Sequence, residues 1–485
     1  MTAYGEFRSG MDKDKHDTRF VFYGFRYILE QYLHRPWTME DLEQVDAFFR
    51  NHLAPNNSAF PYPKDLFLKF VAENNGYFPV QLQCLREGTV ANARVPVYQI
   101  TAKDEYARLV TYLETLLTQV WYPCTVATLS RRAKDVIAIG YEKTVDEGSQ
   151  SPILNSALHD FGFRGCTCVE QSVIGGTAHL LNFCGTDTMS AAFYAQFHLN
   201  QGHPVAGSIP ASEHSVMTSW ETESAAVRHL SSCHGDGMFS VVADSYDYVA
   251  FLRDILPPVV AEQRLGARGG YLILRPDSGD PVECVIQGLQ ALDKVLGSTT
   301  NTKGYKVING GGIIQGDGIN IETIRRIVDA CIKEGFSVQS VAFGMGGGLL
   351  QKVNRDSMSF ATKLCHIIYK DGTERDAMKR PTTDSGKISL PGKLQVRRLH
   401  GVPTVFPADL PEQELPGDAS QEPDLLQVVY DCGPLPPTAP CSLTTDTFDQ
   451  LRQRVETEWH SCPKNYDPIS TALRTKIDHF LAPKQ

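Results

Sequence analysis

Six polar or glycine positions recur at a steady stride through the middle of the chain, each shortly after an apolar run. The intervals between them are 27, 30, 33, 40 and 29 residues. A strand, a loop and a returning helix need about 30 residues, so the stride predicts consecutive βα units with a chemical group after each strand. In a (β/α) barrel those strand ends share the face that holds the active site. The six positions are Asp187, His214, Asp244, Asp277, Asp317 and Gly346.

The runs before these positions are short and rich in Val, Ile, Leu and Phe, as buried parallel strands are. Helical patterns return between them, and Asn320 and Gly335 are the predicted N-cap and stop signal of the last helix. The alternation predicts an α/β fold. We expect strands at 178–183, 205–209, 239–243, 271–274, 313–314 and 338–343, and helices at 246–256, 282–296 and 321–333.

Composition limits the class of protein. The chain has 485 residues, 42% of them hydrophobic, which is enough for a sizeable core and for two or three domains. Its net charge of −10 argues against a nucleic-acid partner, for which a basic face is expected. The 12 cysteines include no CxxC pair, which is typical of reduced thiols. No signal peptide or membrane-spanning run is visible, so we expect a soluble cytoplasmic protein without a membrane partner.

The two ends of the chain have mixed helix and strand patterns instead of the regular βα alternation of its middle. Thr38 opens a helical pattern with Asp41 in capping-box position. We therefore predict an α+β domain built from residues 1–150 and 388–485, and a barrel domain formed by residues 151–387. Further helical patterns in the two ends lie at 20–33 and 107–120, and strand patterns at 77–85, 95–100 and 426–430.

Three loops after predicted strands suit a phosphorylated ligand. The segment 338–351 reads VQSVAFGMGGGLLQ, in which backbone N–H groups can approach an anion closely. Arg275 and Asp277 in the preceding loop offer a planar cation and a carboxylate, which suit a ribose diol, a phosphate edge or a metal ion. Asp317 lies between two glycines. Each loop alone is more often a plain turn or a surface ion pair, but three on one barrel face indicate a site.

His214 is the single residue for which the sequence most strongly suggests a catalytic role. It follows a predicted strand, and Glu213 beside it could hold the tautomer of its ring. A hydrogen-bonded barrel histidine is the ordinary alternative. On the same rim as acidic residues, however, it could act as a base, or as a nucleophile that accepts a phosphoryl group from ATP. Three further histidines lack this setting and are expected to be structural: His159, His179 and His203.

Seven motifs, in one order and at closely similar spacing, resemble those of the nicotinamide phosphoribosyltransferase family. This is a type II phosphoribosyltransferase family that is related to the nicotinate phosphoribosyltransferases. The likeness runs from about residue 22 into the C-terminal helices, so it covers nearly the whole chain. The motifs are HDFGFR at 159–164, GTD at 185–187, EHS at 213–215, DSYD at 244–247, RPDSG at 275–279, QGDG at 315–318 and GMGGGLLQ at 344–351.

The resemblance implies an irregular (β/α) barrel adjoining an α+β domain, in a homodimer whose active sites lie at the subunit interface. It implies transfer of the phosphoribosyl group of phosphoribosyl pyrophosphate to nicotinamide in NAD salvage, which gives nicotinamide mononucleotide and pyrophosphate. Mg²⁺ is the implied cofactor. ATP is the implied co-substrate, and its hydrolysis through a phosphohistidine is an energetic aid.

The same resemblance assigns catalytic residues. His214 takes the place of the phosphorylated histidine, with Glu213 and Asp244 as its supports, and Asp277 joins them as a catalytic residue. Asp277 and Asp244 are also the implied metal ligands. The implied substrate contacts are Phe161, Arg164, Asp187, Ser245, Arg275, Gly316, Asp317, Gly346, Gly347, Arg355, Lys363 and Lys379.

Within that set, Phe161 matches the ring that stacks on the pyridine, and Asp187 matches the acceptor of the carboxamide N–H₂. A carboxylate attracts an amide but repels the carboxylate of nicotinate, so nicotinamide is the favoured base and a nicotinate phosphoribosyltransferase is the alternative. The family's N-terminal segment, which covers the other side of the ring, has no secure counterpart near Tyr4 and Arg8. A weakly active nucleotide-binding homologue is therefore the second alternative.

Overall fold

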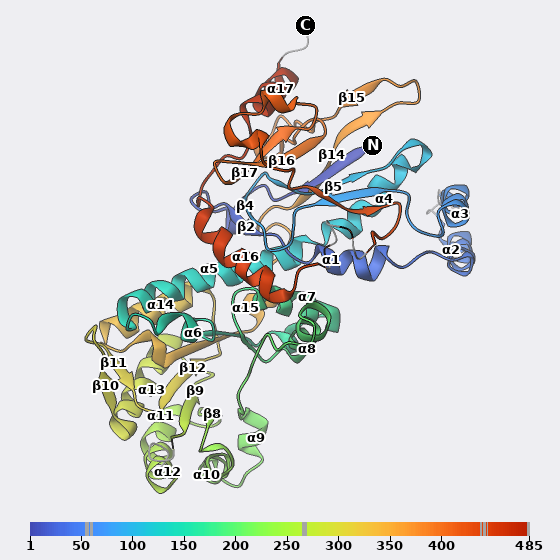
Figure 1. Ribbon diagram of the computed structural model, residues 1–485. Coiled ribbons are helices and arrows are strands. Elements are labelled where there is room, and N and C mark those ends of the chain that lie inside the picture. The colour runs from blue at the N-terminus through green and yellow to red at the C-terminus, as the bar shows by residue number, and fades with distance from the viewer. Residues whose placement is uncertain are drawn as a thin grey trace. The chain divides into compact units, whose positions relative to one another are not determined.

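The protein is described by a computed structural model over residues 1–53, 58, 62–263, 269–436, 439, 443 and 445–482. Contacts divide the chain into two compact units, coloured by position along the chain in Figure 1. Unit 1 comprises residues 1–128 and 354–485, and unit 2 comprises residues 129–353. The predicted ranges placed both boundaries later in the chain. No helix in the described part of the chain is long and apolar enough to cross a membrane.

Unit 2 is built on a parallel six-stranded sheet in the order β7-β6-β13-β12-β9-β8. An extended segment joins the two edges of this sheet: Gly207 bridges Gly185 of β7, and Ala211 bridges Ser240 of β8. The sheet is thereby closed into an irregular barrel, and the predicted fold class is confirmed. The strands are β6 (Leu158–Asp160), β7 (Gly185–Thr186), β8 (Met238–Val242), β9 (Tyr271–Arg275), β12 (Gly311–Gln315) and β13 (Val341–Met345).

Helices connect these strands, and α13 (Pro281–Leu296) packs on β12 and against α14 (Ile321–Lys333) (Figure 1). The predicted helix at 321–333 is confirmed with its N-cap, because the Asn320 side chain accepts the Thr323 N–H at 3.0 Å. The remaining elements of unit 2 are α6 (Gln150–Leu154), α7 (Val169–Leu180), α8 (Met189–Tyr194), α9 (His214–Thr218), α10 (Glu223–His234), α11 (Tyr248–Ala250), α12 (Leu256–Gln263), β10 (Ser298–Thr300), β11 (Lys306–Ile308) and α15 (Gly347–Leu350).

Three strand predictions in unit 2 differ from the structure. The run 178–183 begins inside α7, because an apolar segment that is buried on all sides gives the same pattern in a helix as in a strand. The run 338–343 begins with a 3₁₀ turn (Val338–Ser340), so β13 starts only at Val341. The run 205–209 pairs only through the Gly207 bridge and forms no regular strand. Strand β6, by contrast, was not expected.

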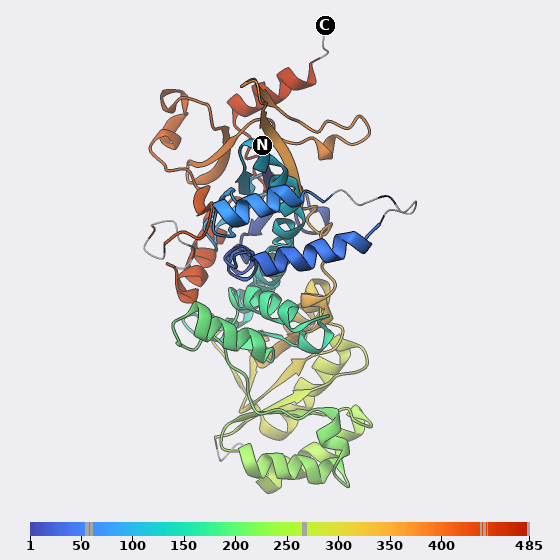
Figure 2. The same ribbon diagram turned by 90° about the vertical axis from the view of Figure 1, so that its right-hand side faces the viewer.

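Unit 1 contains an antiparallel sheet in the order β15-β14-β1-β5-β3-β18. Strand β1 (Thr2–Glu6) lies in its interior between β14 (Ala361–Ile368) and β5 (Pro96–Thr101), so the chain from 354 onward folds with the N-terminus (Figure 2). The other elements are β2 (Arg19–Val21), α1 (Phe25–Ile28), α2 (Met39–Asn51), α3 (Lys64–Glu73), β3 (Gln81–Cys84), β4 (Val90–Asn92), α4 (Arg108–Thr118), β15 (Glu374–Asp376), β16 (Leu394–Leu399), β17 (Val402–Pro407), β18 (Gln427–Asp431), α16 (Phe448–Ser461) and α17 (Thr471–Leu481). Helix α5 (Trp121–Thr144) contains the boundary between the units.

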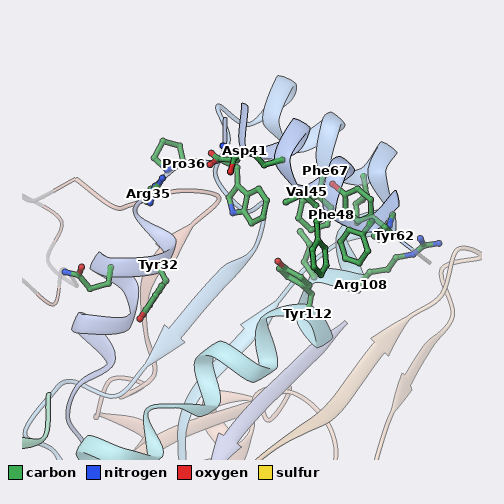
Figure 3. Close-up of a pocket in the computed structure, with 17 residues that line it drawn as sticks. Tyr32, Arg35, Pro36, Asp41, Val45, Phe48, Tyr62, Phe67, Arg108 and Tyr112 are labelled. Carbon is green, nitrogen blue, oxygen red and sulfur yellow. The ribbon is translucent and has the colours of Figure 1, made fainter. Parts of the chain in front are cut away.

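An aromatic cavity of about 800 Å³ lies in unit 1, with side chains from α2, α3 and α4 in its wall (Figure 3). Helix α2 begins with the predicted capping box of Thr38 and Asp41. Phe67 is 3% exposed and meets the rings of Trp37 and Tyr112 edge-on, with centroids 5.4 and 5.5 Å away. Phe48, in the same wall, is 57% exposed. The α3 side of the cavity is therefore packed, whereas the α2 side is open to solvent.

Candidate active site

The six regularly spaced positions of the sequence lie at one end of the barrel. Each of them follows the carboxyl end of a strand, or of the extended segment that closes the barrel. Asp187 comes directly after β7, and Asp244 and Asp277 follow β8 and β9. Asp317 and Gly346 follow β12 and β13 in the same way. In parallel strands these ends share an edge, so groups far apart in the sequence become neighbours.

His214 and Asp244 form the centre of the site. The Nε2 of His214 lies 3.1 Å from Oδ1 of Asp244. Oδ2 of Asp244 accepts hydrogen bonds from the Ser278 hydroxyl at 2.5 Å and from the Asp277 N–H at 3.1 Å. Because three donors converge on Asp244, its carboxylate is fixed, and it holds the His214 ring through one nitrogen only.

Glu213 does not share this supporting role. Its carboxylate accepts a hydrogen bond from the Ser215 hydroxyl, and it is the N-cap residue of α9. Consecutive residues at the start of a helix do not face each other, which explains why the predicted contact with His214 is not made. Ser245 follows Asp244 directly and interacts with Glu223, whose carboxyl has its pKa raised by burial.

A second group of residues surrounds the Phe161 ring. The Arg275 guanidinium lies 5.1 Å from the ring centroid and donates to Oδ2 of Asp277 at 2.9 Å. A Cβ at Gly316 would lie 2.9 Å from Oδ1 of Asp277, and one at Gly344 would lie 2.1 Å from Cε2 of Phe161. The two glycines therefore permit the close packing of this ring against its neighbours.

A cavity of about 390 Å³ lies inside the barrel, and Asp187 lines it together with Phe161 and Arg275. The Ser208 hydroxyl donates to Oδ1 of Asp187 at 2.6 Å. A cavity of this size, with mostly apolar walls and a few convergent polar groups, is typical of a small-molecule site.

His159, which was expected to be structural, and Ser208, which was not singled out in the sequence, line the same cavity. The His159 ring centroid lies 6.3 Å from that of Phe161, and burial lowers the pKa of His159, so its ring is neutral at neutral pH. The alternation of side chains along a strand could have revealed His159, because residues i and i+2 share a face and Phe161 lies two positions later. This argument needs β6 to be known as a strand, which the sequence did not predict. His179, by contrast, is buried and bonded to Ser130 and to Gly185 O, as a structural histidine is.

The remaining predicted loop residues of unit 2 lie at the same strand ends, and their side chains make no hydrogen bond or ion pair with another described residue. Arg164 is exposed in the turn Phe163–Gly165, and Asp317 is exposed after β12. Gly346 is the residue before α15, and Gly347 begins that helix. In the described part of the chain, no three His, Cys, Asp or Glu side chains gather as a protein-only metal site.

The predicted cations beyond residue 353 belong to unit 1 and not to the cluster in unit 2. Lys363 lies in β14, and burial lowers the pKa of its ammonium. Arg355 is exposed with its guanidinium 3.5 Å from Asp356, and Lys379 is also exposed. Lys387 pairs with Asp384 at 3.1 Å on the surface.

Residues 156–410 match the model of the Nicotinate phosphoribosyltransferase (NAPRTase) family. The chain is 40% identical over 384 residues to the Nicotinamide phosphoribosyltransferase of Xanthomonas campestris pv. campestris, covering 78% of this chain and 80% of the relative. It is 29% identical over 471 residues to the Nicotinamide phosphoribosyltransferase of Acinetobacter baylyi, covering 92% and 90%. The crystal structure of human Nicotinic Acid Phosphoribosyltransferase shares the fold, with a TM-score of 0.60 and 17% identity over 99% of this chain and 95% of that one.

Barrel, site and relatives together define a phosphoribosyltransferase enzyme. The chain belongs to the nicotinate phosphoribosyltransferase (NAPRTase) family.

Proposed function

We propose that the protein transfers the phosphoribosyl group of phosphoribosyl pyrophosphate to nicotinamide, which yields nicotinamide mononucleotide and pyrophosphate in NAD salvage. The observation that carries the proposal is that an aromatic ring, Phe161, and a carboxylate, Asp187, line one cavity in the barrel. Both relatives described above bear the name of this activity. The ring offers a stacking face for a pyridine, and the carboxylate offers an acceptor for its amide.

Asp187 selects the base. Its Oδ1 is engaged by the Ser208 hydroxyl, which holds the carboxylate in place and leaves Oδ2 for an incoming N–H₂ group. Nicotinate would bring a second carboxylate against this one, and like charges at contact distance are unfavourable. Nicotinamide is therefore the preferred substrate.

Arg275 and Asp277 suit the phosphoribosyl donor. The Nε of Arg275 is buried and has no hydrogen-bond partner among the described residues, so it is a donor prepared for a ligand oxygen. Oδ1 of Asp277 accepts no hydrogen bond from the described residues. Mg²⁺ usually binds one or two carboxylates together with substrate phosphates and water, so Asp277, with Asp244 beside it, would hold this ion. Bound there, Mg²⁺ supplies charge neutralisation of the leaving pyrophosphate.

The residues of the cavity then position the reaction. Departure of pyrophosphate leaves an oxocarbenium-like ribose, and the pyridine nitrogen must lie in line with it. Stacking on Phe161 and the hydrogen bond to Asp187 fix the base in two directions, which converts the attack into a step between held partners. Arg275 stabilises negative charge on the donor side.

His214 is the proposed acceptor of a phosphoryl group from ATP. Asp244 accepts the Nε2–H of His214, so the lone pair is on Nδ1. Nδ1 attacks the γ-phosphorus, the bond between that phosphorus and the bridging oxygen breaks, and ADP leaves. Water later cleaves the phosphorus–nitrogen bond to give phosphate and the free histidine. The protein thus couples ATP hydrolysis to nucleotide synthesis.

The active sites are proposed to be shared in a homodimer, with Arg355, Lys363 and Lys379 of unit 1 serving the partner's site. Mixing His214→Ala and Lys363→Ala, two variants that should each lack ATP-stimulated activity, tests this. Heterodimers of the two would contain one site with both defects and one site with none, so activity should reappear on mixing and reassociation. Mixtures that stay inactive, although a dimer forms, would overturn the shared site.

The activity itself is tested with purified protein, phosphoribosyl pyrophosphate, Mg²⁺ and either base, with and without ATP. We expect mononucleotide from nicotinamide, more of it with ATP, and little from nicotinate. Product from nicotinate alone would show a nicotinate phosphoribosyltransferase. Binding of nucleotide without product from either base would show a binding homologue.

A further inference from the structure

Asp160 is a buried acid between His159 and Phe161, the two neighbouring residues that line the cavity. It is the last residue of β6, and its relative exposure is 0%. His159 and Phe161 line the cavity, whereas Asp160 points away from it toward α7, where a Cβ at Gly176 would lie 3.1 Å from its Oδ2. The Asp160 carboxyl therefore does not line the cavity, and any effect on a ligand there must pass through its neighbours.

Asp160 makes a contact on each side of the proposed base site. Its Oδ1 accepts the N–H of Gly162 at 2.7 Å, which fixes the peptide that follows Phe161. Its carbonyl oxygen accepts the N–H of Asp187 at 3.0 Å, which fixes the backbone of the opposite wall. One residue thus ties together the stacking ring and the amide acceptor.

The fold holds this acid without a compensating cation. No Lys or Arg side chain pairs with Asp160 among the described residues, and burial, with a smaller contribution from Asp187, raises its pKa to about 6. His159, with its lowered pKa, and Cys166, with a raised one, are the other titratable groups near this turn. An asparagine would fill the same space without a buried charge. The presence of a carboxylate at this place, where its charge is costly to bury, points to a use in function.

We propose that Asp160 is a positioning residue, which holds Phe161 and Asp187 at the separation that a pyridine carboxamide requires. The inference rests on the proposed function, because nicotinamide is the ligand that these two side chains would hold. A charged acceptor binds the Gly162 N–H more strongly than a neutral one. The base site is therefore best formed while Asp160 is ionised.

The test compares Asp160→Asn with Asp293→Asn, a matched change in the same unit, where Asp293 pairs with Lys306 at 2.8 Å. KM and kcat are measured for both substrates from pH 5 to 8. For Asp160→Asn we expect the KM for nicotinamide to rise about tenfold, the loss of a fraction of one charge-assisted hydrogen bond, with the KM for phosphoribosyl pyrophosphate within about twofold. Asp293→Asn should change neither KM.

The wild-type enzyme should also show a rise in the KM for nicotinamide below about pH 6, and Asp160→Asn should be flat across that range. Equal rises in both KM values, an unchanged KM, or a wild-type profile flat from pH 5 to 8 would overturn the inference. Equilibrium dialysis with labelled nicotinamide separates the two proposals if turnover is absent. Binding that weakens in Asp160→Asn supports the positioning role even then, and wild-type protein that binds no nicotinamide overturns both.

Discussion

Asp244 and His214 differ sharply in exposure although they share a hydrogen bond of 3.1 Å. The Asp244 side chain is 3% exposed, and that of His214 is 46% exposed. Asp244 is anchored by Ser278 and by the peptide of Asp277, so the buried partner is fixed and the exposed partner presents its free nitrogen outward. That exposed side of the ring is open to a large anion such as the triphosphate of ATP.

Replacing Asp244 with Asn should therefore impair ATP coupling. The amide N–H₂ would oppose the His214 Nε2–H, and the ring would lose both its orientation and its acceptor. We expect ATP stimulation and phosphoprotein formation to fall by about 10² or more, in the range seen for oriented nucleophiles and bases.

His214→Ala is the companion variant, and it should abolish both signals while the protein keeps its melting temperature, because the side chain is half exposed. Phosphoprotein is measured with ATP labelled at the γ-phosphate. Label that persists in His214→Ala would assign the phosphoryl acceptor to another residue.

Replacing Asp187 with Ser should relax the choice of base. The variant loses a charge-assisted hydrogen bond to the carboxamide, which is worth about 1.5–3 kcal/mol, so kcat/KM for nicotinamide should fall about 10- to 100-fold. The repulsion toward nicotinate disappears at the same time, and its kcat/KM should rise. Kinetics with both bases side by side check this, and an unchanged ratio of the two would exclude Asp187 as the selecting residue.

The fold was readable from the sequence where local signals were strong. Helix 321–333 was predicted to the residue because Asn320 caps it and Gly335, with a φ of +76°, follows it. The run 178–183 was misread because α7 is buried along most of its length and offers no polar face to set its period. Strand β1 was missed because its place in the sheet depends on pairing with residues 361–366, far along the chain.

The sequence allowed the loops of the candidate site to be predicted, but not which of their side chains contact one another. The stride placed Asp244 and Asp277 on one rim, yet nothing in it distinguishes Asp244 from Glu213 as the support of His214. That choice depends on how β8 and the closing segment lie side by side, which brings Asp244 to the ring. The role of Asp160 likewise appears only when the β6 register sets it beside Thr186 and Met345.

Gly344→Ala should damage the base site through packing alone. Its new Cβ would lie 2.1 Å from Cε2 of Phe161, so the ring must shift. Overpacking of this kind costs about 1–3 kcal/mol of stability, and the KM for nicotinamide should rise with it. Gly237→Ala is the control, since the nearest atom to its Cβ would be 3.9 Å away. A Gly344→Ala protein with normal KM would show that the Phe161 ring does not contact the base.

The aromatic cavity of unit 1 provides a matched pair for stability. Phe67→Ala removes a ring that is 3% exposed and should lower the free energy of unfolding by about 3–5 kcal/mol. Phe48→Ala removes a ring that is 57% exposed in the same wall and should lower it by less than about 1 kcal/mol. Urea unfolding of the two variants measures the difference, and equal losses would mean that the α2 side is packed in solution.

Asp160→Asn should change stability in a direction opposite to its effect on base binding. The folded protein raises the pKa of Asp160 from 3.8 to about 6, so between these pH values the folded state binds more protons than the unfolded state. The stability from this group is present in full below pH 3.8 and is lost as the pH rises through about 6. Ionised Asp160 therefore destabilises the fold at neutral pH by up to about 3 kcal/mol, since each pKa unit is worth about 1.4 kcal/mol.

The variant carries no such group, so its free energy of unfolding relative to the wild type should increase between pH 4 and pH 7 by up to that amount. Urea unfolding of both proteins at the two pH values measures the change, and titrations common to both proteins cancel in the difference. A variant that binds nicotinamide less well and yet gains stability at pH 7 would show that the buried carboxylate serves the site at a cost in stability. A difference that is constant with pH, or that decreases, would show that Asp160 does not titrate in this range.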